Sequence, residues 1–351
     1  MWIYERPEAE AGRSFAGRAV APALPDGESG KAGGRGADVL GEAERAGFVE
    51  AGDLALWGAG IDTEGSVAIL FEVGRVCAGW GMALHSLALA RRLSRELGGG
   101  DVAIAASPIA PRCPPLEVLE RPDPSWIEPR LEGDRATGIF PHAWGFPRPD
   151  ASGSDDVLAF VRGDGWALVR ARAAVTRDDG RRLGLRACDL FRVELAGRAE
   201  VAASGERARQ LLEEHVARLW LGMAALAAGC AAGAVREAAR YAAERFQGGS
   251  AIEKHAAVSM LLGEARARAD SAVAALGAAR QTLVASARVR LTATADAACA
   301  VTRSLQVLGG AGYMEDFPLC KRLRDVEVLR ISQGTPDDLR RILAADLARC
   351  A

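Results

Sequence analysis

The part of this 351-residue chain that follows residue 204 contains three long runs that are rich in alanine and free of proline. They cover residues 205–246, 253–281 and 284–308. Alanine is the strongest helix former, whereas a proline inside a helix costs about 3 kcal/mol, so these runs predict long helices. Small side chains allow helix axes to approach closely, which favours a bundle. A last helix is predicted at 336–349, where Thr335 can cap the first turn and Pro336 suits its first position.

The N-terminal part returns to a helical pattern after an irregular start. Residues 11–37 are rich in Gly, Ala, Pro and Arg without a period, and we expect a loop there. Between residues 69 and 97 apolar side chains recur at steps of three and four, which predicts a helix that stops at Gly98.

The middle of the chain favours strands. Prolines cluster at 108–129 and argue against helix there. The runs 156–162 and 166–170 flank Gly163-Asp-Gly165, the pattern of a hairpin. Apolar and polar residues alternate around Val193, as in a strand with one face in water. We therefore predict an α-helical domain (1–100), a β domain (101–203) and a helical bundle domain (204–351).

Composition excludes several classes of function. The net charge of −2 gives no basic face for nucleic acid, and the seven cysteines include no C-x-x-C pair that would indicate a metal site. The N-terminus lacks the pattern of a secretory signal. The uncharged run 219–235 is mostly Ala and Gly and is shorter than the ~20 residues of a bilayer span, so we expect a buried helix rather than a membrane segment. A cytoplasmic location is expected.

A signature near the C-terminus carries most information about function. Gln306-Val-Leu-Gly-Gly-Ala-Gly-Tyr-Met-Glu-Asp-Phe-Pro318 is followed by Arg324-Asp325 and by Ile331-Ser-Gln-Gly-Thr335. This order and spacing resemble the C-terminal signature of the acyl-CoA dehydrogenase family. The resemblance implies an α+β fold with a helical N-terminal domain, a central β-barrel-like domain and a C-terminal four-helix bundle. It also implies FAD and an acyl thioester, on CoA or on an acyl-carrier protein.

A second stretch, Tyr241 to Ile252, resembles the family motif Arg-x-Gln-Phe-Gly-x-x-Ile. The resemblance matches the motif's Arg, Gln and Gly to Arg245, Gln247 and Gly249, with Gly248 in place of Phe. It implies that Arg245 reaches the FAD pyrophosphate of a neighbouring subunit, and a planar guanidinium can grip a phosphate with two hydrogen bonds. The resemblance also matches the family's contacts to the adenine side of FAD to Gln306, Gly309 and Gly310. It matches the family's threonine near the flavin ring to Thr335.

The family's catalytic base is missing from both of its known positions. Family enzymes remove a proton from the carbon α to the thioester while a hydride leaves the β-carbon for the flavin. The glutamate that takes the proton maps to Gln333, and a side-chain amide cannot act as a base near neutral pH. A branch of the family carries the glutamate at the position of Leu219, next to an arginine that maps to Trp220. A general base typically raises the reaction rate about 10²–10⁴-fold, so loss of the glutamate should severely reduce dehydrogenase activity.

Other candidate groups have simpler interpretations. Asp325 is expected to stabilise helix ends together with Arg324, and His255 is expected on the surface. Trp144 can cover a flavin or fill the core, and the core is favoured. The remaining titratable groups show no catalytic ordering: Glu315, Glu327, Asp337, His85, His142 and His215.

Three functions fit these observations. The chain can be a divergent FAD-dependent oxidoreductase that acts on the CH–CH group of an acyl thioester. It can be a catalytically silent subunit that completes the FAD site of an active homologous partner, in a homo- or hetero-oligomer. It can also be a flavin-dependent oxygenase on the same fold. The empty base positions favour the last two, and the retained cross-subunit FAD residues favour the silent subunit over the oxygenase.

Overall fold

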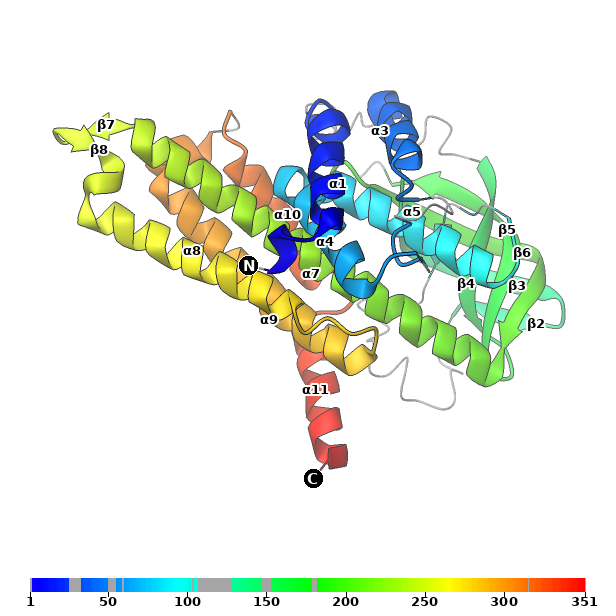
Figure 1. Ribbon diagram of the computed structural model, residues 1–351. Coiled ribbons are helices and arrows are strands. Elements are labelled where there is room, and N and C mark those ends of the chain that lie inside the picture. Colours follow the sequence, from blue (N-terminus) through cyan, green and yellow to red (C-terminus); the bar gives the residue numbers. More distant parts are fainter. Residues whose placement is uncertain are drawn as a thin grey trace.

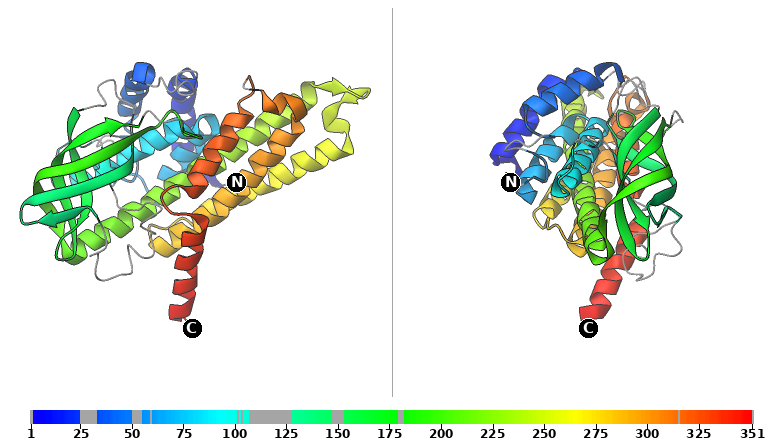
Figure 2. Two further views of the ribbon diagram at one scale, coloured as in Figure 1. Left: turned by 180° about the vertical axis from the view of Figure 1, so that it is seen from behind. Right: turned by 90° about the vertical axis from the view of Figure 1, so that its right-hand side faces the viewer.

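A computed structural model describes residues 2–24, 33–49, 55–58, 60–100, 102, 104–106, 128–146, 153–178, 182–314 and 316–350. Helices from both ends of the chain surround one long central helix, and a β-barrel covers one end of it (Figures 1 and 2). The α+β architecture expected from the sequence, with helical domains before and after a barrel-like sheet, is confirmed.

The N-terminal helices are η1 (Trp2–Tyr4), α1 (Pro7–Phe15), the π-helical η2 (Ala16–Val20), α3 (Gly33–Arg45), α4 (Thr63–Val76) and α5 (Ala78–Glu96). The expectation of a loop over 11–37 is wrong for the described residues, because most of them are helical. Ala9, Phe15 and Val20 are buried, and α1 lies against α4, so tertiary packing outweighs the weak local pattern. Residues 25–32 lie outside the described part.

The helix expected over 69–97 is two helices. Asp62 caps α4 by accepting a hydrogen bond from the Gly65 amide at 2.6 Å. Cys77 takes an extended conformation and separates α4 from α5. The turn at Cys77 sends α5 along the side of the barrel (Figure 1).

The barrel consists of β1 (Ile104–Ala106), β2 (Arg130–Glu132), β3 (Arg135–Gly145), β4 (Gly153–Arg162), β5 (Trp166–Arg177) and β6 (Asp189–Ser204). The strand order is β1-β4-β2-β3-β6-β5, and an additional pairing of β4 with β5 closes the ring. The predicted hairpin is confirmed as β4 and β5, with Arg162 opposite Trp166. Most of the proline-rich segment 108–129 lies outside the described residues.

The C-terminal domain begins with α7 (Gly205–Glu244), and continues through β7 (Phe246–Gln247), β8 (Ser250–Ala251), η3 (Ile252–Lys254), α8 (Ala256–Leu276), α9 (Leu283–Val307), η4 (Gly309–Tyr313), α10 (Leu319–Ile331) and α11 (Pro336–Cys350). Helix α7 is long and apolar enough to cross a membrane, but 94% of its most apolar window is buried inside the protein. The expected buried helix is therefore confirmed. Helix α11 projects from the body and carries the C-terminus (Figures 1 and 2).

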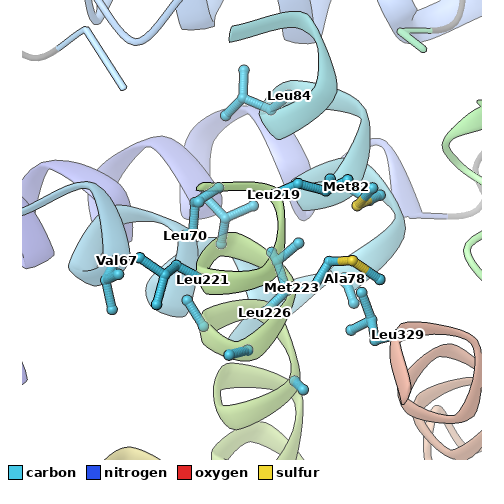
Figure 3. Close-up of a cluster of buried hydrophobic side chains, with 14 of the residues drawn as sticks. Val67, Leu70, Ala78, Met82, Leu84, Leu219, Leu221, Met223, Leu226 and Leu329 are labelled. Atoms are coloured by element: carbon cyan, nitrogen blue, oxygen red, sulfur yellow. The ribbon is translucent and has the colours of Figure 1, made fainter. Parts of the chain in front are cut away.

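Glycines allow α4 and α7 to cross closely. A Cβ on Gly74 would lie 2.6 Å from the Leu226 carbonyl oxygen, and one on Gly229 would lie 2.1 Å from the Phe71 carbonyl oxygen. Neither position can accept a side chain without separating the helices. Around this crossing Leu70, Met82, Leu221 and Leu226 form part of the main core (Figure 3).

A buried carboxylate ties the bundle to the barrel domain. Asp325 on α10 accepts a hydrogen bond from the Leu185 amide at 2.6 Å and pairs with Lys321 on its own helix. Next to it, a Cβ on Gly184 would lie 2.5 Å from the Arg324 carbonyl oxygen. The Arg324-Asp325 pair therefore holds the loop between β5 and β6, in line with the structural role expected for it.

Asp325→Ala should lower the free energy of unfolding by about 3–5 kcal/mol, because it leaves the buried Lys321 charge without its carboxylate. Urea denaturation followed by circular dichroism measures the loss. The matched control is Asp337→Ala, which breaks an exposed pair with Arg340 and should cost less than about 1 kcal/mol. Equal losses in the two variants would contradict the tie described here.

Candidate functional site

Two separate sites contain the residues that the sequence singled out. The first is an open pocket of about 590 Å³ at the end of the bundle that is far from the barrel (Figure 1). We call it the distal pocket. It lies between the end of α7, the β7–β8 hairpin, the start of α8 and the turn after α9, and is lined by Tyr241, Arg245, Gln247, Gly248, Ile252, His255, Val258, Val307, Leu308, Gly309, Gly310 and Ala311.

The hairpin positions Arg245 at the mouth of this pocket. Gly248 and Gly249 have φ angles of 65° and 84°, which suits a tight two-residue hairpin turn. His255 supports the turn, since its Nε2 lies 2.9 Å from the Gln247 carbonyl oxygen. The Arg245 side chain is exposed, and no carboxylate of the described residues pairs with it. An unpaired guanidinium at an open pocket suits a phosphate ligand.

The glycine turn after α9 forms the opposite wall. Gly309 has a φ of 55°, a conformation that glycine adopts without strain. A Cβ on Gly310 would meet no atom of this chain within 4 Å, so its wall of the pocket is open. Four of the six predicted cofactor residues thus meet here: Arg245, Gln247, Gly309 and Gly310. Gln306 is exposed on the last turn of α9 and lies outside the lining.

Large exposed apolar side chains lie close in sequence to residues that line the distal pocket. Phe246, Met260 and Tyr313 are 69%, 74% and 86% exposed, and Met314 is half exposed. Each lies within three residues of a residue that lines the pocket. Exposed large apolar side chains that lie together are typical of a surface that contacts another protein.

The second site is a cavity of about 30 Å³ where the barrel, α5 and α7 meet. We call it the central cavity. Its described lining residues are Ser86, Leu89, Ala105, His142, Ala143, Trp144, His215, Leu219 and Gln333. Both positions of the family base, Gln333 and Leu219, therefore face one space. None of the described lining residues is a carboxylate.

The turn that carries Gln333 is fixed by its own backbone. Gln333 has a φ of 55°, in the left-handed region, and Gly334 follows with 108°. The Gln333 carbonyl oxygen accepts hydrogen bonds from Trp220 Nε1 at 2.8 Å and from Arg290 Nη1 at 3.0 Å. The peptide at the base position is thus bonded to both α7 and α9.

Arg290 is a functional neighbour that the sequence did not indicate. It is fully buried on α9 and also donates to the carbonyl oxygens of Leu329 and Ser332 at the end of α10. Burial lowers the pKa of Arg290 to about 9, and Asp338 opposes this shift. The carbonyl end of a helix favours a cation, so α10 stabilises the buried charge. A single arginine inside a helical run carries no signal of this role.

The structure brings two histidines to the central cavity that looked isolated in the sequence. His215 lies four residues before Leu219, which places both on the same face of α7. Burial lowers the pKa of His215 to about 3, with smaller contributions from Arg218 and His85. His142 reaches the cavity because β3 has a bulge between Phe140 and Ala143. The spacing of His215 could have been noticed, and Pro141 within the strand is a local signal of the bulge.

His85 locks α5 to α7 beside the cavity. Trp57 Nε1 donates to His85 Nδ1 at 3.1 Å, so the ring proton lies on Nε2, which faces the Leu219 carbonyl oxygen at 3.2 Å. Burial lowers the pKa of His85 to about 4. The histidine is therefore neutral at pH 7 and acts as a structural bridge.

The other predicted residues have mainly local partners. The Thr335 hydroxyl donates to Asp338 Oδ2 at 2.7 Å and accepts a hydrogen bond from the Asp338 amide at 3.3 Å, so Thr335 caps the start of α11 as expected. The Trp144 side chain is partly buried, and its Nε1 has no hydrogen-bond partner among the described residues. Glu327 and Asp337 pair with arginines on their own helices, and Glu315 lies outside the described residues.

The two buried histidines should make the fold sensitive to acid. Their pKa values in the folded chain, about 4 for His85 and about 3 for His215, lie below the usual 6.5. The unfolded chain therefore binds more protons below pH 6.5, and stability should fall by up to about 1.4 kcal/mol per pH unit for each histidine. Urea unfolding between pH 7 and 4.5 measures this slope. His215→Leu should flatten it, and an unchanged slope would contradict the assignment.

Comparisons with known proteins identify the relatives of the C-terminal part of this chain. Residues 215–348 match the family model of the acyl-CoA dehydrogenase C-terminal domain. A short-chain specific acyl-CoA dehydrogenase of Clostridium acetobutylicum is 29% identical over 136 residues, which are 37% of this chain and 36% of that protein. The sequence match thus spans about a third of the length of such relatives.

Solved structures are similar over nearly the whole chain. Butyryl-CoA dehydrogenase from Megasphaera elsdenii superposes with a TM-score of 0.78 at 16% identity and covers 97% of both chains. A glutaryl-CoA dehydrogenase from Mycobacterium smegmatis in complex with FADH2 gives 0.79 at 14% identity, over 98% of this chain and 94% of the other. At these identities the likeness concerns the fold.

Proposed function

Because the C-terminal domain of this chain belongs to the acyl-CoA dehydrogenase family and the whole chain has that fold, we propose that it is a subunit of an FAD-dependent acyl-thioester oxidoreductase. In this proposal it supplies the distal pocket to an FAD whose flavin ring lies in a homologous partner subunit. The chain itself removes no proton from the substrate.

The separation of the two sites supports this proposal most strongly. One unbroken helix, α7, connects them, and Leu219 at the central cavity is 26 residues before Arg245 at the distal pocket. A rise of 1.5 Å per residue places these positions about 39 Å apart. One extended FAD is shorter than that. An FAD held by Arg245 therefore needs its flavin ring in another chain.

The distal pocket suits the adenosine diphosphate end of FAD. The exposed Arg245 guanidinium can hold the pyrophosphate, and the open glycine turn lets a ligand approach the backbone at Gly309 and Gly310. The exposed Phe246, Met260 and Tyr313 give the surface on which the partner would lie. FAD, when bound, would supply the acceptor for the hydride.

The central cavity does not suit proton abstraction. Gln333 offers an amide, Leu219 a hydrocarbon, and the low pKa of His215 makes it a weak base. The acyl thioester would therefore react in the partner, on a chain that keeps the glutamate. No observation at this cavity favours an oxidoreductase that acts alone, and none favours an oxygenase.

The proposal predicts that Gln333→Glu creates no dehydrogenase. The new carboxylate would face a cavity of about 30 Å³ that leaves no room for thioester and flavin. Dye reduction is measured with short-, medium- and long-chain acyl-CoA, for the variant alone and with excess FAD. Turnover by this variant would show that only the base is missing and would refute the silent role.

Arg245→Gln should weaken FAD binding by the assembled complex about 10- to 100-fold, because it removes a charge-assisted hydrogen bond worth about 1.5–3 kcal/mol. The chain is co-expressed with a glutamate-bearing homologue, and FAD is counted by visible absorbance after desalting. The matched control is Arg240→Gln on the same helix, which lies outside the pocket lining. Equal FAD content in both variants would rule out the shared site.

A further inference from the structure

We infer that this chain has lost the place for a flavin ring, so that one FAD serves each pair of this chain and its partner. The inference rests on the proposed function for the ligand of the distal pocket. It goes beyond the proposed function in one respect. A chain that has lost its catalytic base could still bind the flavin ring of an FAD of its own, in addition to the FAD that it shares with the partner. Here the space at the ring site itself is only about 30 Å³.

The closed space is identified by three positions from different elements. Gln333 follows α10, Leu219 lies on α7, and Trp144 lies on β3, yet all three line the central cavity. The first two are the base positions of the family, and a base must lie against the reacting carbons beside the flavin. The central cavity is therefore where a flavin ring would have to lie.

The size of this space excludes a tricyclic ring. The described residues leave about 30 Å³, which holds one or two water molecules. Pockets for ligands of this size are commonly about 300–1,000 Å³. The distal pocket, at about 590 Å³, falls within that range and shares no lining residue with the cavity. The chain thus keeps one half of an FAD site and lacks the other.

The walls of the cavity are fixed by the backbone. Leu219 lies in the packed core near Met82 (Figure 3), and its carbonyl oxygen faces His85 Nε2. The Gln333 peptide is bonded to Trp220 and Arg290.

Trp144 lines the cavity from the barrel side. It is paired with Leu190 in the ladder between β3 and β6, and the bulge just before it directs His142 to the same space. The strand therefore places two ring-bearing side chains, His142 and Trp144, at the cavity.

Titration of the full-length chain tests this inference. Calorimetry is carried out with ADP, FAD and riboflavin 5′-phosphate, and flavin absorbance is recorded in parallel. We expect the dissociation constants of ADP and FAD to differ by no more than about threefold, which is a difference in binding free energy below about 1 kcal/mol. The absorbance bands of the flavin should remain those of free FAD. Riboflavin phosphate should not bind. Tighter binding of FAD by tenfold or more, shifted flavin bands, or binding of riboflavin phosphate would overturn the inference.

Two variants separate the sites. Arg245→Gln should weaken ADP and FAD equally, whereas Trp144→Phe should change neither. An effect of Trp144→Phe on FAD alone would place a flavin ring in the central cavity and refute the inference. If ADP does not bind at all, the proposed role of the distal pocket is contradicted. Whether this chain holds a flavin ring is then decided by counting FAD in the assembled complex.

The count of FAD in the assembled complex is the independent measurement. With a glutamate-bearing homologue as partner, absorbance and protein quantification should give one FAD for two chains. Two FAD molecules for two chains would show that this chain holds a flavin ring and would refute the inference even if the isolated chain binds ADP as expected.

Discussion

The burial of α7 is the constraint on which the rest of the structure depends. This helix of 40 residues contacts α4, α5, α8, α9, α10 and the barrel, and its most apolar part lies inside the protein. Because it is continuous, it fixes the separation of the two sites along its length. A helix that broke between Leu219 and Arg245 would let them approach, and the case for a shared cofactor would weaken.

Much of the fold followed from local patterns. Proline-free alanine-rich runs predicted α7, α8 and α9, and the Gly163-Asp-Gly165 turn predicted β4 and β5. The helices at 7–20 were missed because their buried side chains are spaced among glycine and arginine, and only contact with α4 stabilises them. The break at Cys77 was missed because the apolar period continues through it.

The sites were predicted unequally for a physical reason. The distal pocket is built from two short segments that each keep a recognisable order, so Arg245, Gln247, Gly309 and Gly310 could be named in advance. The central cavity is built from single residues on distant elements. His142 and His215 enter it through a strand bulge and helix packing, and Arg290 supports it by bonding the Gln333 carbonyl oxygen.

The projecting α11 has a practical consequence for studying assembly. Its last residue with described structure, Cys350, is exposed, whereas Cys77, Cys188 and Cys230 are buried and Cys299 and Cys320 are partly covered. Among the described cysteines, a thiol-reactive fluorophore would thus react first at the tip of this arm, away from the residues that line either pocket (Figure 1). The chain carries its own attachment point for a reporter of subunit association.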